Sequence, residues 1–158
     1  MHDTITPAAP TQYLSFALGG LEYGIDFARV QELRVLKALE RFAAAGAIVG
    51  GVAVSRGVIM PLVDMRAAFG TSPGAPDPMT DVIILKLSRC TMGMVVDGVT
   101  GVVTLAPDQM APLPGAQGVQ ADYLVGLWQA GGRRLILLDI ERLMSVKGPV
   151  AGARRQFA

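Results

Sequence analysis

A strict alternation of apolar and polar residues around a glycine pair restricts the N-terminal part of the chain to β-structure. The apolar positions are Leu14, Phe16 and Leu18 before Gly19-Gly20, and Leu21, Tyr23 and Ile25 after it. A period of two residues places alternate side chains on one face of a strand, and paired glycines can adopt the positive φ angles that a two-residue turn requires. The segment therefore predicts a β-hairpin.

A second hairpin is predicted near the C-terminus, where residues 123–129 and 134–138 flank a turn around Gly131-Gly132. Between the hairpins, further runs are short, rich in β-branched residues and bounded by Gly, Pro or Asp. These candidate strands are residues 52–54, 58–63, 82–87, 92–96 and 102–105. Pro61 favours an edge or bulged position in its run, because proline cannot donate to a strand ladder. Strand signals thus dominate the chain.

The sequence also repeats itself weakly, at an offset of 69 residues that becomes 75 further on. The matching positions are Phe16, Leu18, Gly24, Ile25, Phe27 and Val30 with Leu85, Leu87, Gly93, Met94, Val96 and Val99, and then Gly51, Leu62, Val63 and Asp64 with Gly126, Leu137, Leu138 and Asp139. Folded proteins tolerate a few extra residues in one loop, which accounts for the change of offset. The pattern predicts two similar β-modules in tandem.

Each module is expected to end in the same way, with an apolar strand, an aspartate and a short helical turn. Asp64 precedes residues 65–69, which Gly70 would stop, and Asp139 precedes a segment with Ile140, Leu143 and Met144 on one face. Modules with about five short strands usually close into small barrels, which removes exposed sheet edges. We therefore predict an all-β fold of two tandem five-stranded β-barrels with short helical turns.

The expected domain boundaries follow from the same pattern. Residues 12–78 form the first module and residues 79–147 the second, joined by the proline-rich stretch 73–78. Residues 1–11 and 148–158 are expected to be flexible tails.

Several glycines and aspartates at strand ends are expected to form turns or helix caps. They are Gly51, Gly57, Asp64, Asp97, Gly98, Gly126 and Asp139.

One segment carries a different period. Val30, Leu33, Leu36, Leu39 and Phe42 are spaced by three residues with charged residues between them, as on an amphipathic helix. We expect at least part of this segment to be helical or irregular.

Charge and composition exclude several classes of function. The formal net charge is +1, and basic residues are scattered rather than gathered on a face, which argues against a nucleic-acid binder. The charge-free stretch 42–55 is too short and too rich in glycine to span a membrane, and residues 1–11 lack the features of a signal peptide. The single cysteine, Cys90, fits a reducing compartment. These features predict a cytoplasmic protein.

Few residues could support catalysis. The only histidine is His2, in an expected tail, and Cys90 has no histidine beside it in the sequence. The glycine pairs lack the lysine and the spacing of a phosphate-binding loop and are better explained as turns. We therefore expect neither an enzyme nor a metal or cofactor site.

Several stretches together resemble the CheW family of chemotaxis coupling proteins. They are Tyr13–Leu18, Glu22–Asp26, Val30–Leu33, Ser55–Arg66, Gly93–Val99 and Leu135–Ile140. Their order and spacing cover the chain from Gln12 to about Met144. The resemblance implies that the two barrels are of the SH3-like type, in agreement with the repeat. It also implies an adaptor without activity of its own and without a cofactor.

The resemblance further implies two protein partners: the regulatory domain of a CheA-type histidine kinase and the cytoplasmic tip of methyl-accepting chemoreceptors. The adaptor would be recruited to membrane receptor arrays through these partners, with no direct membrane insertion. Carried over by position, the residues that meet receptor or kinase are Val30, Glu32, Arg56, Val82 and Val99. Core packing is the alternative for the three valines. Arg56, in a stretch with few charges, needs water or a carboxylate for its guanidinium.

The chain departs from the family pattern at two places. Residues 37–47 contain no proline, and Ser55 stands where the family has an apolar residue. Two other functions stay open from the sequence. One is a scaffold of the same fold in a chemosensory-like pathway that controls pili or second messengers. The other, of a different class, is a small-ligand-binding β-barrel, for which a ligand would raise thermal stability.

Overall fold

The computed structural model describes residues 10–42, 49–68, 79–112 and 123–147. Its strands are β1 Thr11–Leu18, β2 Leu21–Asp26, β3 Val30–Val35, β4 Glu40–Phe42, β5 Val49–Ser55, β6 Val58–Asp64, β7 Asp81–Lys86, β8 Thr91–Val95, β9 Gly98–Leu105, β10 Met110–Ala111, β11 Leu124–Ala130 and β12 Arg133–Leu138. The helices are α1 Met65–Ala68 and α3 Ile140–Lys147, and 3-10 turns span Phe27–Arg29, Leu36–Ala38 and Pro107–Gln109. The expected C-terminal tail, the stop at Gly70 and the proline-rich joint lie outside the described residues, as does all of the N-terminal tail before residue 10.

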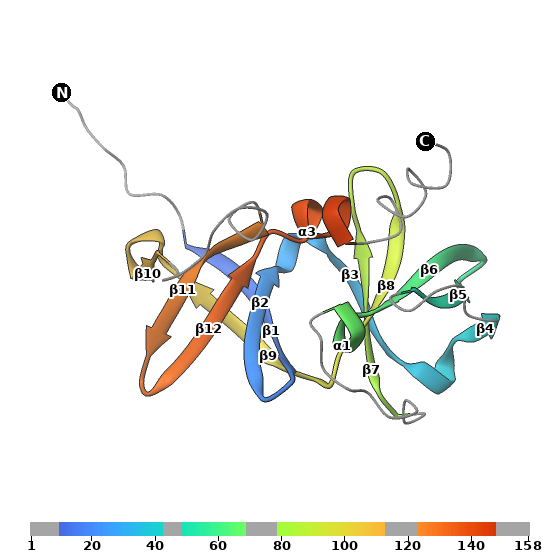
Figure 1. Cartoon of the computed structure of the whole chain (residues 1–158), viewed down its shortest axis with the longest axis horizontal. Helices are drawn as coiled ribbons and strands as arrows, with labels where there is room; N and C mark the ends of the chain where they lie inside the picture. Colours follow the sequence, from blue (N-terminus) through green and yellow to red (C-terminus); the bar gives the residue numbers. More distant parts are fainter. Residues whose placement is uncertain (1–9, 43–48, 69–78, 113–122, 148–158) are drawn as a thin grey trace.

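The strands form two sheets of six (Figure 1). The first has the order β10-β11-β12-β2-β1-β9, and the second has the order β3-β7-β8-β6-β5-β4. Both predicted hairpins are confirmed, because β1 pairs with β2 from Tyr13–Asp26 to Leu18–Leu21, and β11 pairs with β12 across the turn at Gly131-Gly132.

Both sheets are curled into barrels. Strands β3 and β4 lie at opposite ends of the second sheet, yet only the 3-10 turn Leu36–Ala38 and Leu39 separate them along the chain. Two edges that a few residues can connect must lie close together, so the sheet closes on itself. Strands β9 and β10 close the first sheet in the same way through Pro107–Gln109. The predicted all-β fold of two SH3-like barrels is confirmed; six strands replace five because a 3-10 turn interrupts one strand of each barrel.

The strands are not divided between the barrels as the modules 12–78 and 79–147 predict. Hairpin β1–β2 pairs with β9 and β12, and hairpin β7–β8 pairs with β3 and β6. The first barrel therefore combines the N-terminal hairpin with β9 to β12, and the second barrel is built from β3 to β8. Each half of the chain gives its first hairpin to the barrel of the other half. In addition, β1 begins at Thr11, inside the expected tail.

The internal repeat is visible where the halves exchange hairpins. In the first barrel Gly24 lies opposite Leu137 in a parallel pair, and in the second barrel Gly93 lies opposite Leu62. These four residues are repeat equivalents. A Cβ atom on Gly24 would lie 3.0 Å from Leu137 Cδ2, and one on Gly93 would lie 2.6 Å from Leu62 Cδ2. A side chain at either crossing would therefore require the facing leucine to move, and the contact is tighter at Gly93.

The segment expected to be partly helical forms strands β3 and β4 joined by a 3-10 turn over Leu36–Ala38. Leu36 and Leu39 are buried in the second barrel, whereas Leu33 is exposed. A spacing of three residues arises here because the tight turn shifts the phase of two short strands, rather than from a continuous helical face.

Each barrel has a small interior core, and a larger cluster is shared between them. Trp128 and Leu135 lie in the first barrel's core, and Met60 and Val82 in that of the second. The shared cluster contains residues of both sheets together with Leu143 and other residues of α3, which lies where the barrels meet (Figure 1). The shared cluster joins the two barrels into one packed body.

Candidate partner-binding surface

The turn between β5 and β6 presents an arginine to solvent. Ser55 pairs with Val58, so that Arg56 and Gly57 form a two-residue hairpin turn, with φ angles of 52° and 78°. Two positive φ angles are typical of a type I′ turn, in which asparagine followed by glycine is favoured. Among the described residues, Arg56 is the one non-glycine residue with a positive φ. A strained backbone at an exposed charged residue is typical of a functional position.

A carboxylate on strand β3 fixes this arginine. Arg56 Nε donates to Glu32 Oε2 at 2.8 Å, and 74% of the arginine side chain remains exposed against 17% of the glutamate side chain. Strand β3 thus supplies the anchor for a turn that lies 24 residues later in the chain. The hydrogen bond from Arg56 lowers the pKa of Glu32 below its usual value and raises the pKa of the guanidinium.

Two further residues complete the contact between β3 and the turn. Arg34 Nη1 donates to Glu32 Oε1 at 3.1 Å and to Ser55 Oγ at 3.4 Å, while its Nη2 donates to the carbonyl oxygen of Ala38 at 3.0 Å. Glu32 therefore accepts from two guanidinium groups, one on each oxygen. The serine that departs from the family pattern has a role here, because its buried hydroxyl accepts from Arg34.

Large apolar side chains are exposed beside this pair in the sequence. Val58 and Ile59 directly follow the turn, and Ile59 is 73% exposed; Leu33 is the neighbour of Glu32 on β3. Exposed apolar residues next to an oriented arginine are typical of protein–protein contacts, where arginine and apolar side chains at the centre dominate affinity.

The predicted site residues do not all share this surface. Glu32 and Arg56 are joined directly, but Val82 is fully buried in the core of the second barrel, which is the alternative that the sequence left open. Val30 and Val99 are half-buried and pack against the shared cluster. They occupy equivalent positions of the repeat, and the backbone N–H of Val99 donates to Asp81 Oδ2 at 2.9 Å.

The residues expected at turns and caps have varied surroundings. Asp64 accepts from the backbone N–H of Arg66 at 3.0 Å, Asp139 from that of Arg142 at 3.2 Å, and Asp97 from that of Gly19 at 2.8 Å. The four glycines differ in whether the backbone conformation or the surrounding space would allow a side chain. Gly51 and Gly57 have positive φ, a Cβ on Gly126 would lie 2.8 Å from Ala111 O, and a Cβ on Gly98 would meet nothing within 4 Å.

Sequence reasoning missed Arg34 as part of the surface, together with the pairing of Glu32 with Arg56. A signal was present, since Glu32 and Arg34 lie two residues apart and therefore on the same face of a strand.

Within the described ranges, no group of three or more His, Cys, Asp or Glu side chains could hold a metal ion. None of the described helices is long and apolar enough to cross a membrane.

Comparison with known proteins decides the family. The family model for the CheW-like domain matches residues 12–147. The chain belongs to the CheW family. Chemotaxis protein CheW of Klebsiella aerogenes is 42% identical over 135 residues, which are 85% of this chain and 81% of that protein. Protein FrzA of Myxococcus xanthus is 25% identical over 93% of this chain and 94% of its own length.

The fold is that of the CheW family as well. The crystal structure of the scaffolding protein TtCheW from Thermoanaerobacter tengcongensis superposes with a TM-score of 0.75, covering 88% of this chain and 95% of that one at 22% identity. The family model and the 42% identical relative confirm the resemblance to the CheW family that the sequence indicated.

Proposed function

We propose that this CheW-family protein is a non-enzymatic cytoplasmic adaptor that couples methyl-accepting chemoreceptors to a CheA-type histidine kinase. Membership of the family supports the role in chemotaxis, since relatives such as the Klebsiella aerogenes protein are named chemotaxis proteins. The observation that carries the coupling role is the Glu32–Arg56 pair, which holds an arginine exposed next to Val58 and Ile59.

The kinase contact is assigned to the surface around Arg56. A carboxylate that accepts from Arg56 and Arg34 orients one guanidinium before a partner arrives, so less conformational entropy is lost on binding. An exposed apolar side chain that follows the turn, such as Ile59, would add apolar buried area to this contact. An acidic group on the regulatory domain of the kinase is the complement that Arg56 predicts.

The receptor contact is assigned to the half-buried valines, Val30 and Val99. Both pack against the shared cluster and keep part of their side chains accessible, as expected for residues that receive an apolar stripe of a receptor helix. Val82 is fully buried and would support this surface from inside the second barrel.

The experiment is a calorimetric titration of the full chain with the regulatory domain of a CheA-type kinase from the same organism, followed by a receptor-tip fragment. We expect saturable binding of both, weakened for the kinase by Arg56→Ala and unchanged by Lys86→Ala. Lys86 is exposed on β7 and serves as the matched loss of a surface charge. Absence of binding to the kinase and to the receptor fragment would reject the adaptor role and leave the fold assignment intact.

A further inference from the structure

A cleft opens between the tips of two hairpins of the first barrel. Strands β2 and β12 run parallel, but their pairing begins only at Tyr23 and Ile136. The preceding residues of each strand diverge toward the turns at Gly20 and Gly131-Gly132. The cleft between them has a volume of about 480 Å³, a size typical of sites for small molecules. Its lining residues are Gly20, Leu21, Glu22, Leu127, Gly131, Gly132, Arg133, Arg134 and Ile136.

One of the two arginines in this cleft is neutralised by the protein itself. Arg133 donates to Glu22 through Nη2 at 2.8 Å and through Nε at 3.0 Å, and it also reaches Ser15 Oγ at 3.1 Å. Thr100 donates to the same carboxylate at 2.7 Å. This geometry lowers the pKa of Glu22, so the carboxylate is charged at neutral pH and balances Arg133.

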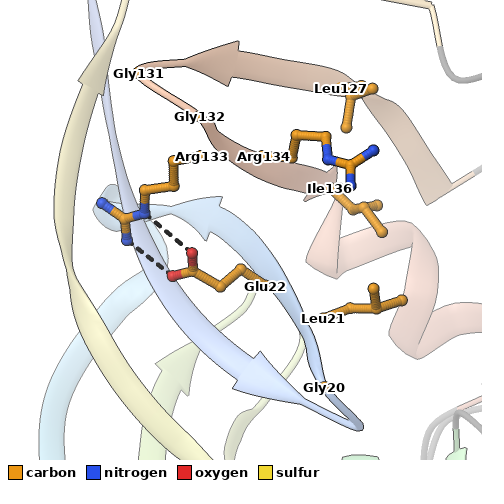
Figure 2. A pocket seen from close by; sticks show the side chains of 9 residues that line it. All are labelled: Gly20, Leu21, Glu22, Leu127, Gly131, Gly132, Arg133, Arg134 and Ile136. Atoms are coloured by element: carbon orange, nitrogen blue, oxygen red, sulfur yellow. Dashed lines mark hydrogen bonds and ion pairs between the residues drawn. The ribbon is translucent and has the colours of Figure 1, made fainter.

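The second arginine is not balanced. Within the described part of the chain, Arg134 is exposed and its side chain makes no hydrogen bond or ion pair. Figure 2 shows its side chain turned away from the Arg133–Glu22 pair and toward Leu127 and Ile136, with Leu21 beyond them. Leu127 and Ile136 are half-buried and Leu21 is 54% exposed. The cleft therefore combines an apolar wall with one uncompensated positive charge.

The second barrel shows that the fold does not require this arrangement. By the offsets of the repeat, Arg133 and Arg134 correspond to Val58 and Ile59, and Leu21 and Glu22 correspond to Cys90 and Thr91. The second barrel closes with the same strand order and without a charged residue at any of these positions. Barrel closure therefore does not account for the charged residues at these positions of the first barrel.

We propose that this cleft binds a small carboxylic acid with an apolar chain. A single free guanidinium matches a monoanion, and its planar donors pair with the two oxygens of a carboxylate. A phosphate dianion would need a second free cation, which Glu22 withholds by engaging Arg133. The apolar chain would lie along Leu21, Leu127 and Ile136.

The test is a nuclear magnetic resonance titration of the isotope-labelled full chain with octanoate, and separately with acetate and with 1-octanol. Acetate carries the charge without the chain, and octanol carries the chain without the charge. We expect octanoate to give saturable shifts centred on the amides of Leu21, Arg134 and Ile136, with much weaker effects of the other two compounds. Arg134→Gln should weaken octanoate binding at least about tenfold, as for one lost charge-assisted hydrogen bond.

Three further variants protect the test against a folding defect. Arg134→Lys retains the charge and should bind octanoate, whereas Leu21→Glu places a negative charge in the cleft and should not. Lys86→Gln, on a distant strand, should bind like the unchanged protein. The proposal is overturned by an absence of saturable shifts, by shifts centred elsewhere, by equal effects of octanol, or by full binding in Arg134→Gln. Because no kinase or receptor is present, the result is independent of the adaptor role.

Discussion

Glu32 holds Arg56 by a hydrogen bond of 2.8 Å while leaving three quarters of the arginine side chain in solvent. The glutamate is anchored on strand β3 and is also held by Arg34. The pair is therefore asymmetric: one residue is part of the barrel wall, and the other extends from it. An exposed pair of this kind adds little to stability, because solvent screens the charges.

Removing Arg56 should separate the effect on binding from the effect on stability. Arg56→Ala is expected to weaken binding to the kinase regulatory domain by about tenfold or more, as for a central charged contact, and to leave the free energy of unfolding nearly unchanged, because solvent screens the exposed pair. Calorimetry and urea unfolding measure the two quantities. Equal losses in both would assign the pair to the structure instead.

The backbone at Arg56 should tolerate asparagine better than arginine. Asparagine adopts positive φ more readily and is favoured at the first position of a type I′ turn. Arg56→Asn is therefore expected to leave the free energy of unfolding unchanged or to raise it slightly, although kinase binding falls. Urea unfolding with Arg56→Ala as the comparison checks this. A clear loss of stability in the asparagine variant alone would contradict the turn assignment.

The hairpin crossing at Gly93 should not accept a methyl group. A Cβ there would lie 2.6 Å from Leu62 Cδ2 and 3.2 Å from Val82 Cγ1, both of them in the buried core. Gly93→Ala is expected to destabilise the protein by about 1–3 kcal/mol through overpacking. Adding Leu62→Val should recover part of the loss in a double-mutant cycle. Gly98→Ala, where space is open, is the matched control and should be nearly neutral.

The Glu22–Arg133 pair should make stability depend on acid pH. The hydrogen bond from Arg133 is the main cause that lowers the pKa of Glu22 in the folded protein, whereas the unfolded value is about 4.3. The resulting stability is present above the unfolded pKa and is lost as the pH falls toward the folded pKa. Glu22→Gln should reduce stability at neutral pH by less than about 1 kcal/mol, because the pair is partly exposed, and should flatten the acid slope. Unfolding curves at several pH values measure this, with exposed Glu40→Gln as the control.

The shared cluster should make both barrels unfold together. Leu143 of α3 is fully buried in a cluster that contains residues of both sheets. Leu143→Ala is expected to cost about 2–5 kcal/mol and to shift one common transition. Fluorescence of Trp128, in the first barrel, should change at the same denaturant concentration as the circular dichroism of the whole chain. Two separate transitions would show that the barrels are independent.

Local patterns in the sequence identified the elements but not all of their partners. The glycine pairs at 19–20 and 131–132 marked both hairpins, because turn chemistry depends on neighbouring residues. The exchange of hairpins was not visible in the sequence, because the pairing of Leu137 with Gly24 joins residues far apart in the chain. The alternation of apolar and polar residues within a strand is the same whichever strand it pairs with. The repeat nevertheless contained the relevant residues, with Gly24 matching Gly93 and Leu62 matching Leu137.

The same limit applies to the surface. Family resemblance identified Glu32 and Arg56 separately, and only the closure of the second barrel brings β3 to the turn that carries Arg56. For Val82, a short apolar strand reads the same whether its side chains fill a core or line a contact. The sequence does not show that Arg134 is an unpaired charge, because this depends on the neutralisation of Arg133 by Glu22, a residue of another hairpin.

The exchange of hairpins also sets an order of events during synthesis. The strands of the second barrel lie between Val30 and Val95, so all of them are synthesised before β9. The N-terminal hairpin emerges first, but its neighbours β9 and β12 are translated last. Once β8 has been synthesised, the nascent chain therefore carries the N-terminal hairpin, still without β9 and β12, next to a barrel whose strands are all present, and the later strands complete the first barrel by pairing with that hairpin.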